Sequence, residues 1–188
     1  MRRTFTWHAG PALVCGASLV ALGLCAGLPF GRWTAGAGWL VAAGFATALP
    51  TGAAALLRCL RAGVDRSTLW ASFRCLPRAA RLSCAGLLLA GVLVTGTASA
   101  GFAGLQDAKA EAGGGYSALD TRTKDRVRVS RERYEEVRAA ERRGFLALPG
   151  TLLVLSGAVV LTLGEWDGAG HRAGAGRTPA TRNRRGAA

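Results

Sequence analysis

Four long stretches of the chain contain no Asp, Glu, Lys or Arg, although the segments between them are rich in charge. The charge-free stretches are Thr4–Gly31, Trp33–Leu57, Leu82–Gln106 and Gly144–Gly164. Even the shortest has 21 residues, enough for a helix to cross the roughly 30 Å hydrocarbon layer of a bilayer. Helices of a water-soluble core normally keep a polar outer face, which these stretches lack. The pattern therefore predicts an all-α membrane protein, a four-helix transmembrane bundle.

The predicted spans are residues 10–30, 33–57, 82–105 and 144–164. The first span follows Arg2 and Arg3 as a signal peptide would, but it has no convincing cleavage site, so we expect it to stay uncleaved. The turn Gly31-Arg32-Trp33 is so short that spans one and two should form an antiparallel hairpin. In span three, Gly86/Ala90, Thr97/Gly101 and Ala100/Gly104 are pairs of small residues suited to close helix packing.

Arginine placement predicts the orientation, because cytoplasmic loops of membrane proteins carry an excess of Lys and Arg. The rule makes the N-terminus (residues 1–9), the Arg-rich loop (58–81) and a disordered basic tail (165–188) cytoplasmic. Segment 106–143 is then extracytoplasmic. Arg142 and Arg143, which flank span four on that side, conflict with the rule.

The loop 58–81 has six arginines and one acid, Asp65. Ser67 is the expected N-cap of a short helix that ends at Pro77, with apolar residues at helical spacing. We predict an amphipathic helix on the membrane face; packing under the bundle is the alternative. Three arginines should then lie near anionic lipid headgroups: Arg74, Arg78 and Arg81.

The segment 106–143 has enough sequence complexity for a small structure, a hairpin plus a helix. Tyr116–Leu119 and Arg126–Val129 are the candidate strands. Ser130 should cap a helix that continues into span four. A mixed-charge helix is most often a solvated face. The alternative is a docking surface, with three candidate partner contacts: Tyr116, Tyr134 and Val137.

The same segment contains Tyr116-Ser-Ala-Leu-Asp, then Val127-Arg-Val-Ser-Arg-Glu-Arg-Tyr, then Ala140-Glu-Arg-Arg-Gly-Phe. This order resembles an uncharacterised family of small four-span membrane proteins from high-GC Gram-positive bacteria, over residues 116–145. The family pattern has a second Tyr where this chain has Ser117, and Gln where it has Arg142. The resemblance implies architecture and no activity.

The net charge of +13 does not indicate a nucleic-acid partner, because the basic residues flank the spans instead of gathering in one patch. The five cysteines form no C-x-x-C pair, and most lie in apolar segments as small hydrophobes. His8 and His171 are too isolated for a metal site. The sequence therefore predicts neither a disulfide framework nor a bound metal.

Transporters and membrane enzymes usually carry ionisable residues inside their spans, and the predicted spans contain no Asp, Glu, Lys, Arg or His. The chain also has no H-E-x-x-H and no P-loop motif. We therefore predict no enzyme, and no catalytic, cofactor-binding or metal site. The expected role is a structural or accessory protein whose partners are the lipid bilayer and another membrane protein or a second copy. A small oligomeric channel or transporter is the alternative, motivated by Pro50 and Pro149.

Overall fold

The computed structural model describes residues 2–26, 38–101 and 104–175. These residues form five helices and three strands: α1 (Arg2–Cys25), α2 (Gly38–Ala62), α3 (Arg66–Cys75), α4 (Arg78–Gly101), β1 (Leu105–Ala110), β2 (Tyr116–Asp120), β3 (Arg126–Val129) and α5 (Arg131–Ala175). Four helices (α1, α2, α4 and α5) are long and apolar enough to cross a membrane. The predicted turn at 31–33 and the parts of the predicted spans at 27–30, 33–37 and 102–103 lie outside the described residues.

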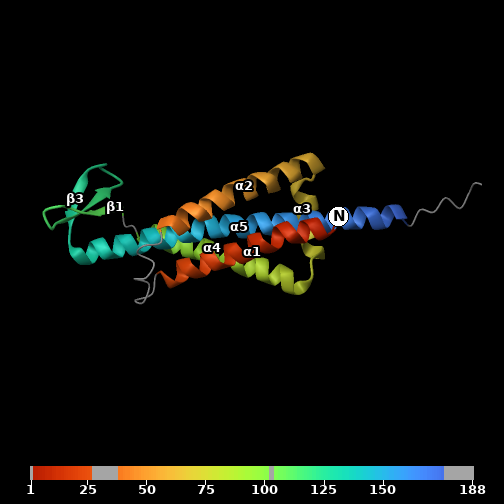
Figure 1. Cartoon of the computed structure of the whole chain (residues 1–188), viewed down its shortest axis with the longest axis horizontal. Coiled ribbons are helices and arrows are strands. Elements are labelled where there is room, and N and C mark those ends of the chain that lie inside the picture. The colour runs from red at the N-terminus through yellow and green to blue at the C-terminus, as the bar shows by residue number, and fades with distance from the viewer. Residues whose placement is uncertain (1, 27–37, 102–103, 176–188) are drawn as a thin grey trace, which may run out of the picture.

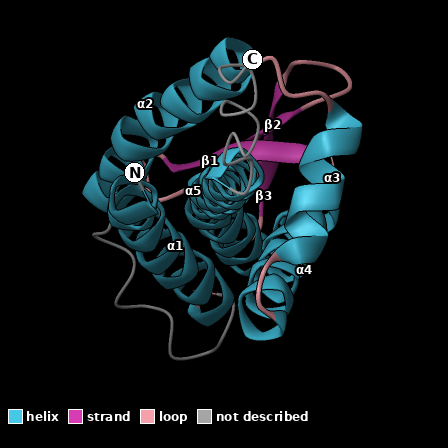
Figure 2. Ribbon diagram, turned by 90° about the vertical axis from the view of Figure 1, so that its right-hand side faces the viewer, coloured by secondary structure: helices cyan, strands magenta, loops and turns pink. Residues whose placement is uncertain are grey.

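Helix α5 is the centre of the bundle. Figure 2 shows it surrounded by α1, α2 and α4. Each of those helices packs mainly on α5, whereas α1 and α2 barely touch each other. In the most apolar part of each helix, 67% of the residues of α5 are buried, against 17% for α2. The predicted α1–α2 hairpin is therefore held together through α5 more than by its own contact.

Helices α1 and α5 approach so closely that their glycines face each other. A Cβ atom added to Gly16 would lie 2.8 Å from the Gly150 carbonyl oxygen, and one added to Gly150 would lie 2.9 Å from that of Gly16. Gly23 and Gly157 form similar close contacts, each seven residues further along its helix. This spacing keeps small residues on one face of each helix, which lets the two backbones come together.

One of the three small-residue pairs predicted in span three, Gly86/Ala90, is not at such a contact. A Cβ atom added to Gly86 would meet nothing within 4 Å. Helix α4 packs instead through Gly91, where an added Cβ would lie only 2.2 Å from Thr151 Oγ1. The spacing of Gly86 and Ala90 shows only that they share one face of α4. It does not show which face of α4 packs on α5, and that face is the one with Gly91.

The short helix α3 links α2 to α4 and confirms a helix in the Arg-rich loop. Its N-cap is Asp65 and not Ser67: Thr68 N–H donates to Asp65 Oδ1 at 2.8 Å, and the Ser67 hydroxyl donates to the same carboxylate. Hydrogen bonds from Thr68 and then Ser67 lower the pKa of Asp65. A carboxylate is the stronger acceptor at a helix N-terminus, because the helix dipole favours negative charge there.

At the opposite end of the molecule lies a three-stranded antiparallel sheet in the order β1-β2-β3 (Figure 1). The predicted hairpin is present as β2 and β3, which pair Tyr116 with Val129 and Ala118 with Val127. Strand β1 was not predicted, because the sequence assigned its start to span three. Helix α4 ends at Gly101, before the predicted end of span three. The described chain is mostly helical, as predicted, but its three-stranded sheet means that it is not all-α. Gly104 then turns the backbone into β1 at a φ of +82°.

Helix α5 begins one residue after Ser130, whose hydroxyl accepts a hydrogen bond from Arg133 N–H at 3.2 Å, as the sequence predicted. It continues without a break into the last span. The helix also extends to Ala175, into the segment predicted to be a disordered tail. No proline occurs between Pro149 and Pro179, so the hydrogen-bonded backbone can propagate past residue 164 despite the glycines. Residues 176–188 lie outside the described part.

The connections alternate between two ends of the bundle. Helix α1 begins and α5 ends at the end where α3 lies, and the sheet lies at the other end (Figure 1). This agrees with the relative placement expected for the N-terminus, the Arg-rich loop and the segment 106–143.

Candidate functional site

The sheet is attached to the first turns of α5 by a small apolar core. Ala108 of β1, Ala118 of β2 and Val137 of α5 are at most 2% exposed, and three partly buried residues pack on them: Leu105, Val129 and Tyr134. We call this unit, residues 104–143, the sheet module. Val137 is one of the predicted partner contacts, but its fully buried side chain joins the helix to the sheet.

The other two predicted contacts, Tyr116 and Tyr134, lie together. Their ring centroids are 4.7 Å apart at a tilt of 33°, and both residues are half-buried. Tyr116 comes from β2 and Tyr134 from α5, so the pair spans the seam between sheet and helix. Tyrosines with one packed face and one open face are well suited to binding a partner.

Asp107 and Lys124 are the two residues other than glycine with a positive φ among the described residues. Asp107 has the larger number of side-chain partners. It lies where the pairing of β1 and β2 shifts register, with a φ of +49°, a left-handed value that side chains seldom adopt. Its N–H donates to Glu141 Oε1 at 2.5 Å, and its carboxylate pairs with Lys109 at 3.1 Å and with Arg126. Lys109, followed by Arg126, holds the pKa of Asp107 below its usual value. Strained residues fixed by several partners are often part of functional sites.

A pocket of about 500 Å³ opens beside Asp107, where α4, the sheet and α5 meet. We call it the junction pocket. Its polar side is formed mainly by the sheet module, with Glu141 only 12% exposed, and its apolar side by Leu119 and the start of the predicted last span. The lining residues are Thr95, Ser99, Gln106, Asp107, Leu119, Arg138, Glu141, Gly144, Phe145 and Leu148. The volume lies within the roughly 300–1,000 Å³ of small-molecule sites.

Two arginines follow Glu141 and directly precede the last predicted span. Arg142 and Arg143 are the residues that conflict with the positive-inside rule. Within the described part of the chain, the Nε atoms of both are buried and have no hydrogen-bond partner. Such unpaired buried donors are uncommon and call for a physical reason.

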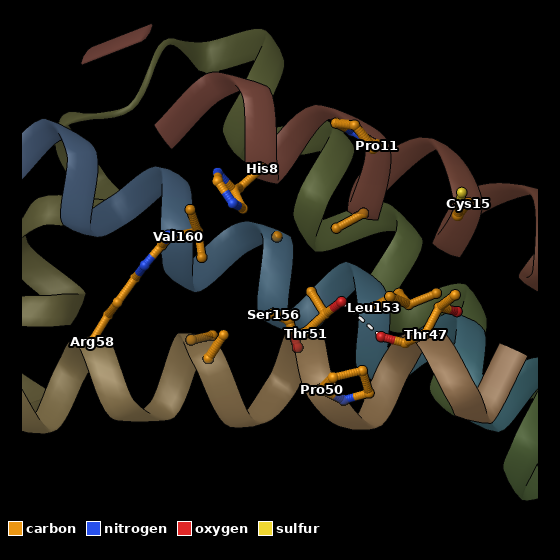
Figure 3. A pocket seen from close by; sticks show the side chains of 14 residues that line it. His8, Pro11, Cys15, Thr47, Pro50, Thr51, Arg58, Leu153, Ser156 and Val160 are labelled. Atoms are coloured by element: carbon orange, nitrogen blue, oxygen red, sulfur yellow. Dashed lines mark hydrogen bonds between the residues drawn. The ribbon is translucent and has the colours of Figure 1, made fainter. Parts of the chain in front are cut away.

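A second pocket, of about 400 Å³, lies inside the bundle between α1, α2 and α5 (Figure 3). Pro11 of α1 and Pro50 of α2 line it, with His8 and Arg58 at one end. We call it the bundle pocket. Its hydroxyls are occupied by backbone carbonyls of their own helices: Thr47 Oγ1 donates to Ala43 O at 2.9 Å, Thr51 Oγ1 to Thr47 O at 2.6 Å, and Ser156 Oγ to Leu152 O at 2.8 Å.

The predicted headgroup contacts lie at the other end of the molecule. Arg74 is in the last turn of α3, and Arg78 and Arg81 are in the first turn of α4. Arg81 Nη1 donates to the Arg74 carbonyl oxygen at 3.0 Å, whereas the side chains of Arg74 and Arg78 are exposed. The structure therefore groups the three arginines across the α3–α4 corner.

Sequence reasoning missed the junction pocket, because its walls come from three separated segments. Among the described residues, no group of three or more His, Cys, Asp or Glu side chains could hold a metal ion. The chain matches no family model, no curated protein and no solved structure. Its function therefore has to be inferred from its own residues.

Proposed function

We propose that the chain is a multi-pass protein of the cell membrane that acts as an accessory or structural protein and binds a membrane partner through the sheet module. The observation that carries this proposal is the joining of the sheet module to α5. The helix that is most buried in the bundle is also the helix on which the sheet is built. A partner bound at the sheet would thus be fixed rigidly to the bundle.

The sheet module is more than a solvated loop. A small sheet alone is marginally stable in water, and here α5 supplies the missing side of its core through Val137. What this support keeps in place on the surface is the pair Tyr116 and Tyr134. Tyrosine is enriched at protein interfaces, because it offers a large contact area at a low entropic cost.

The charge distribution supports a cytoplasmic α3 end, with the N- and C-termini on the same side. Residues 58–81 contain six arginines and one acid, whereas residues 106–143 contain ten basic and eight acidic residues. The first segment is strongly positive for its length and the second nearly balanced. Lys and Arg near the ends of spans favour retention in the cytoplasm.

In-cell photo-crosslinking tests the partner proposal. A photoreactive residue at the exposed Arg128 of β3 should capture one membrane protein, and the same residue at the exposed Arg74 should not. The double variant Tyr116→Ala/Tyr134→Ala should then lose that product. In the reverse direction, the tagged partner should recover the unmodified chain and not the double variant. Equal capture from both ends, or unchanged recovery with the double variant, contradicts the proposal.

Orientation is tested separately, in a chain without its native cysteines. Thr123→Cys, in the exposed β2–β3 turn, should react with a membrane-impermeant maleimide in intact cells. Ser67→Cys, exposed at the start of α3, should react only after the cells are opened. The reverse pattern would place the sheet module in the cytoplasm and overturn the orientation.

A small oligomeric channel or transporter is the second candidate. One observation favours it: α2 is mostly unburied and lines the bundle pocket, so a second copy could complete a path along this helix. The hydroxyls of the pocket are already bonded to helix carbonyls, which weakens the case. Proteoliposomes of the purified chain should show no ion conductance or solute uptake above empty liposomes; reproducible flux would favour this candidate.

A further inference from the structure

The boundary between the sheet module and the bundle contains positive charge for which the described residues offer too few acceptors. The charged residues that line the junction pocket are Arg138, Asp107 and Glu141, and Arg142 lies one turn beyond Arg138 on α5. Lys109 and Arg126 pair with Asp107. Glu141 accepts from the Asp107 N–H and lies 3.8 Å from Arg138, at the outer limit of an ion pair. The remaining charge is therefore positive.

Arg138, whose contact with Glu141 is long, and Arg142 share one face of α5 with the apolar side of the pocket. Arg138, Arg142 and Phe145 follow each other at spacings of four and three residues, so they lie one above another along the helix. The Arg138 side chain is 48% exposed and Phe145 is 53% exposed. A molecule that lies along this face meets guanidinium groups first and an aromatic ring one turn further on.

From this arrangement we infer that the junction pocket and the adjacent arginines bind a phospholipid of the leaflet on the sheet side. Its phosphate pairs with Arg138 and Arg142, and one acyl chain lies against Phe145 and Leu148. The inference rests on the membrane location that we propose above, but not on the partner protein.

The position along α5 favours a phospholipid as the occupant. Gly144 begins the charge-free stretch, so Arg142 lies where lipid phosphates meet the hydrocarbon layer. A phosphate supplies several acceptor oxygens in the geometry that a guanidinium fork matches, and it is the anion that a membrane offers at this depth. The apolar side of the pocket, on the span, suits a ligand whose other end is hydrocarbon.

A bound phosphate also gives a reason for the unusual arginines. A buried donor without an acceptor is destabilising, and arginines beside an extracytoplasmic span end oppose the insertion rule. Both costs fall when the side chain turns its Nε and Nη atoms toward one phosphate. Arg142, one of the two arginines that the topology rule disfavours, then serves to hold a lipid.

Native mass spectrometry of the purified chain in detergent micelles tests this inference. With phosphatidylglycerol added, we expect a retained lipid adduct. Arg138→Gln or Arg142→Gln should each lower the affinity for this lipid about tenfold, as expected for the loss of a charged hydrogen bond. Arg142→Lys should retain an intermediate fraction, because lysine keeps the charge but not the bidentate fork. The matched control is Arg128→Gln, which removes an exposed arginine of the same module and should leave the adduct unchanged.

The added molecules identify what is bound. Phosphatidylcholine with the same chains should also be retained, whereas diacylglycerol, which lacks the phosphate, and inorganic phosphate alone should not compete. Equal adducts for Arg142→Gln and Arg128→Gln contradict the inference, as does equal retention of diacylglycerol. Competition by inorganic phosphate would show a phosphate site that does not need a lipid, and would overturn the assignment of the ligand.

Two measurements separate this inference from the proposed function. Alkaline extraction of membranes should leave the wild-type chain and Arg142→Gln in the membrane fraction. The Arg128 crosslink should still form in Arg142→Gln. If both hold and the adduct does not depend on Arg138 or Arg142, only the lipid site is wrong; loss of the wild-type chain on extraction would contradict the membrane location itself.

Discussion

The two halves of α5 are held in place by different kinds of contact. Residues 131–143 carry the sheet module through a few larger side chains, with Val137 at the centre. From residue 144 onward the helix also meets α1 at glycines, with Gly150 against Gly16, and it buries the larger side chains of Leu146, Leu153 and Val154 around these contacts. The first half has space for side chains between backbone layers, whereas in the second half the backbones themselves nearly touch.

This difference determines which substitutions each half tolerates. A close backbone contact has no space for an extra carbon atom, so the bundle half should be sensitive to added volume. A core made of three buried residues loses a large share of its packing with each methyl group removed, so the module half should be sensitive to lost volume. Sensitivity to an added methyl group should therefore be confined to the glycine contacts of the bundle half.

The largest effect is expected for Gly150→Ala. The new Cβ atom would lie 2.9 Å from both the Gly16 carbonyl oxygen and Leu19 Cβ, atoms that cannot move without shifting α1. We expect a loss of about 3 kcal/mol in the free energy of unfolding, measured in mixed micelles of a mild detergent and SDS. The control Gly86→Ala adds the same methyl group where nothing lies within 4 Å and should be neutral or slightly stabilising. Equal effects of the two variants would contradict the close backbone contact between α1 and α5.

Val137→Ala should destabilise the other half of α5, residues 131–143, where the helix packs on the sheet. The side chain is fully buried against Ala108 and Ala118, so its loss leaves a cavity at the junction of helix and sheet. We expect the sheet module to lose about 2 kcal/mol of local stability, seen as faster amide hydrogen exchange in β2 and β3. Amides of α5 beyond residue 150 should keep their protection. A uniform loss along α5 would mean that the two halves unfold together.

A double-mutant cycle on Tyr116 and Tyr134 sharpens the description of the module half. The rings are 4.7 Å apart, close enough for an aromatic pair to contribute about 1 kcal/mol beyond the area it buries. Tyr116→Leu and Tyr134→Leu should each destabilise the module, and the double variant should cost less than the sum of the two. Strict additivity would show that the rings share no favourable interaction energy.

The smallest effect is expected from acidification. Because the pKa of Asp107 is lower in the folded chain than its ordinary 3.8, its ion pairs stabilise the module above that value and are lost as the pH falls through the folded pKa. Protection of the β1 and β2 amides should thus decline only below about pH 4. The effect is small because the group is exposed and screened by solvent.

Asp107→Asn provides the comparison for this titration, because asparagine also accepts a left-handed backbone. The variant should lose the acid-dependent step, whereas Asp125→Asn, in the β2–β3 turn of the same module, should retain it. Retention of the step in Asp107→Asn would assign the titration to another carboxylate.

Much of the bundle could be predicted because charge is excluded from long segments whatever their tertiary contacts. The four apolar helices and the continuous helix from Ser130 into the last span follow from such local patterns. The hairpin of β2 and β3 also has a local signal, alternating side chains on both sides of a polar turn.

What could not be predicted depends on contacts between distant segments. Strand β1 lacks a regular alternation, because its register shifts between Gln106 and Lys109, and its first residues continue an apolar run. The junction pocket requires α4, β1 and α5 to meet, which no local pattern reports. The close contact between α1 and α5 did have a signal in the sequence. Gly16 and Gly23 are seven residues apart, and so are Gly150 and Gly157.

The length of α5 has a mechanical consequence. At about 1.5 Å of rise per residue, its 45 residues form a rod of roughly 65 Å, longer than a bilayer is thick. The sheet packs on one end of this rod, and the three other long helices pack around its middle. A sideways push or a twist applied to the sheet would reach the far end as movement of the same stiff body. Movement of a protein bound at the sheet would in this way reach the α3 end of the molecule without any rearrangement of the bundle.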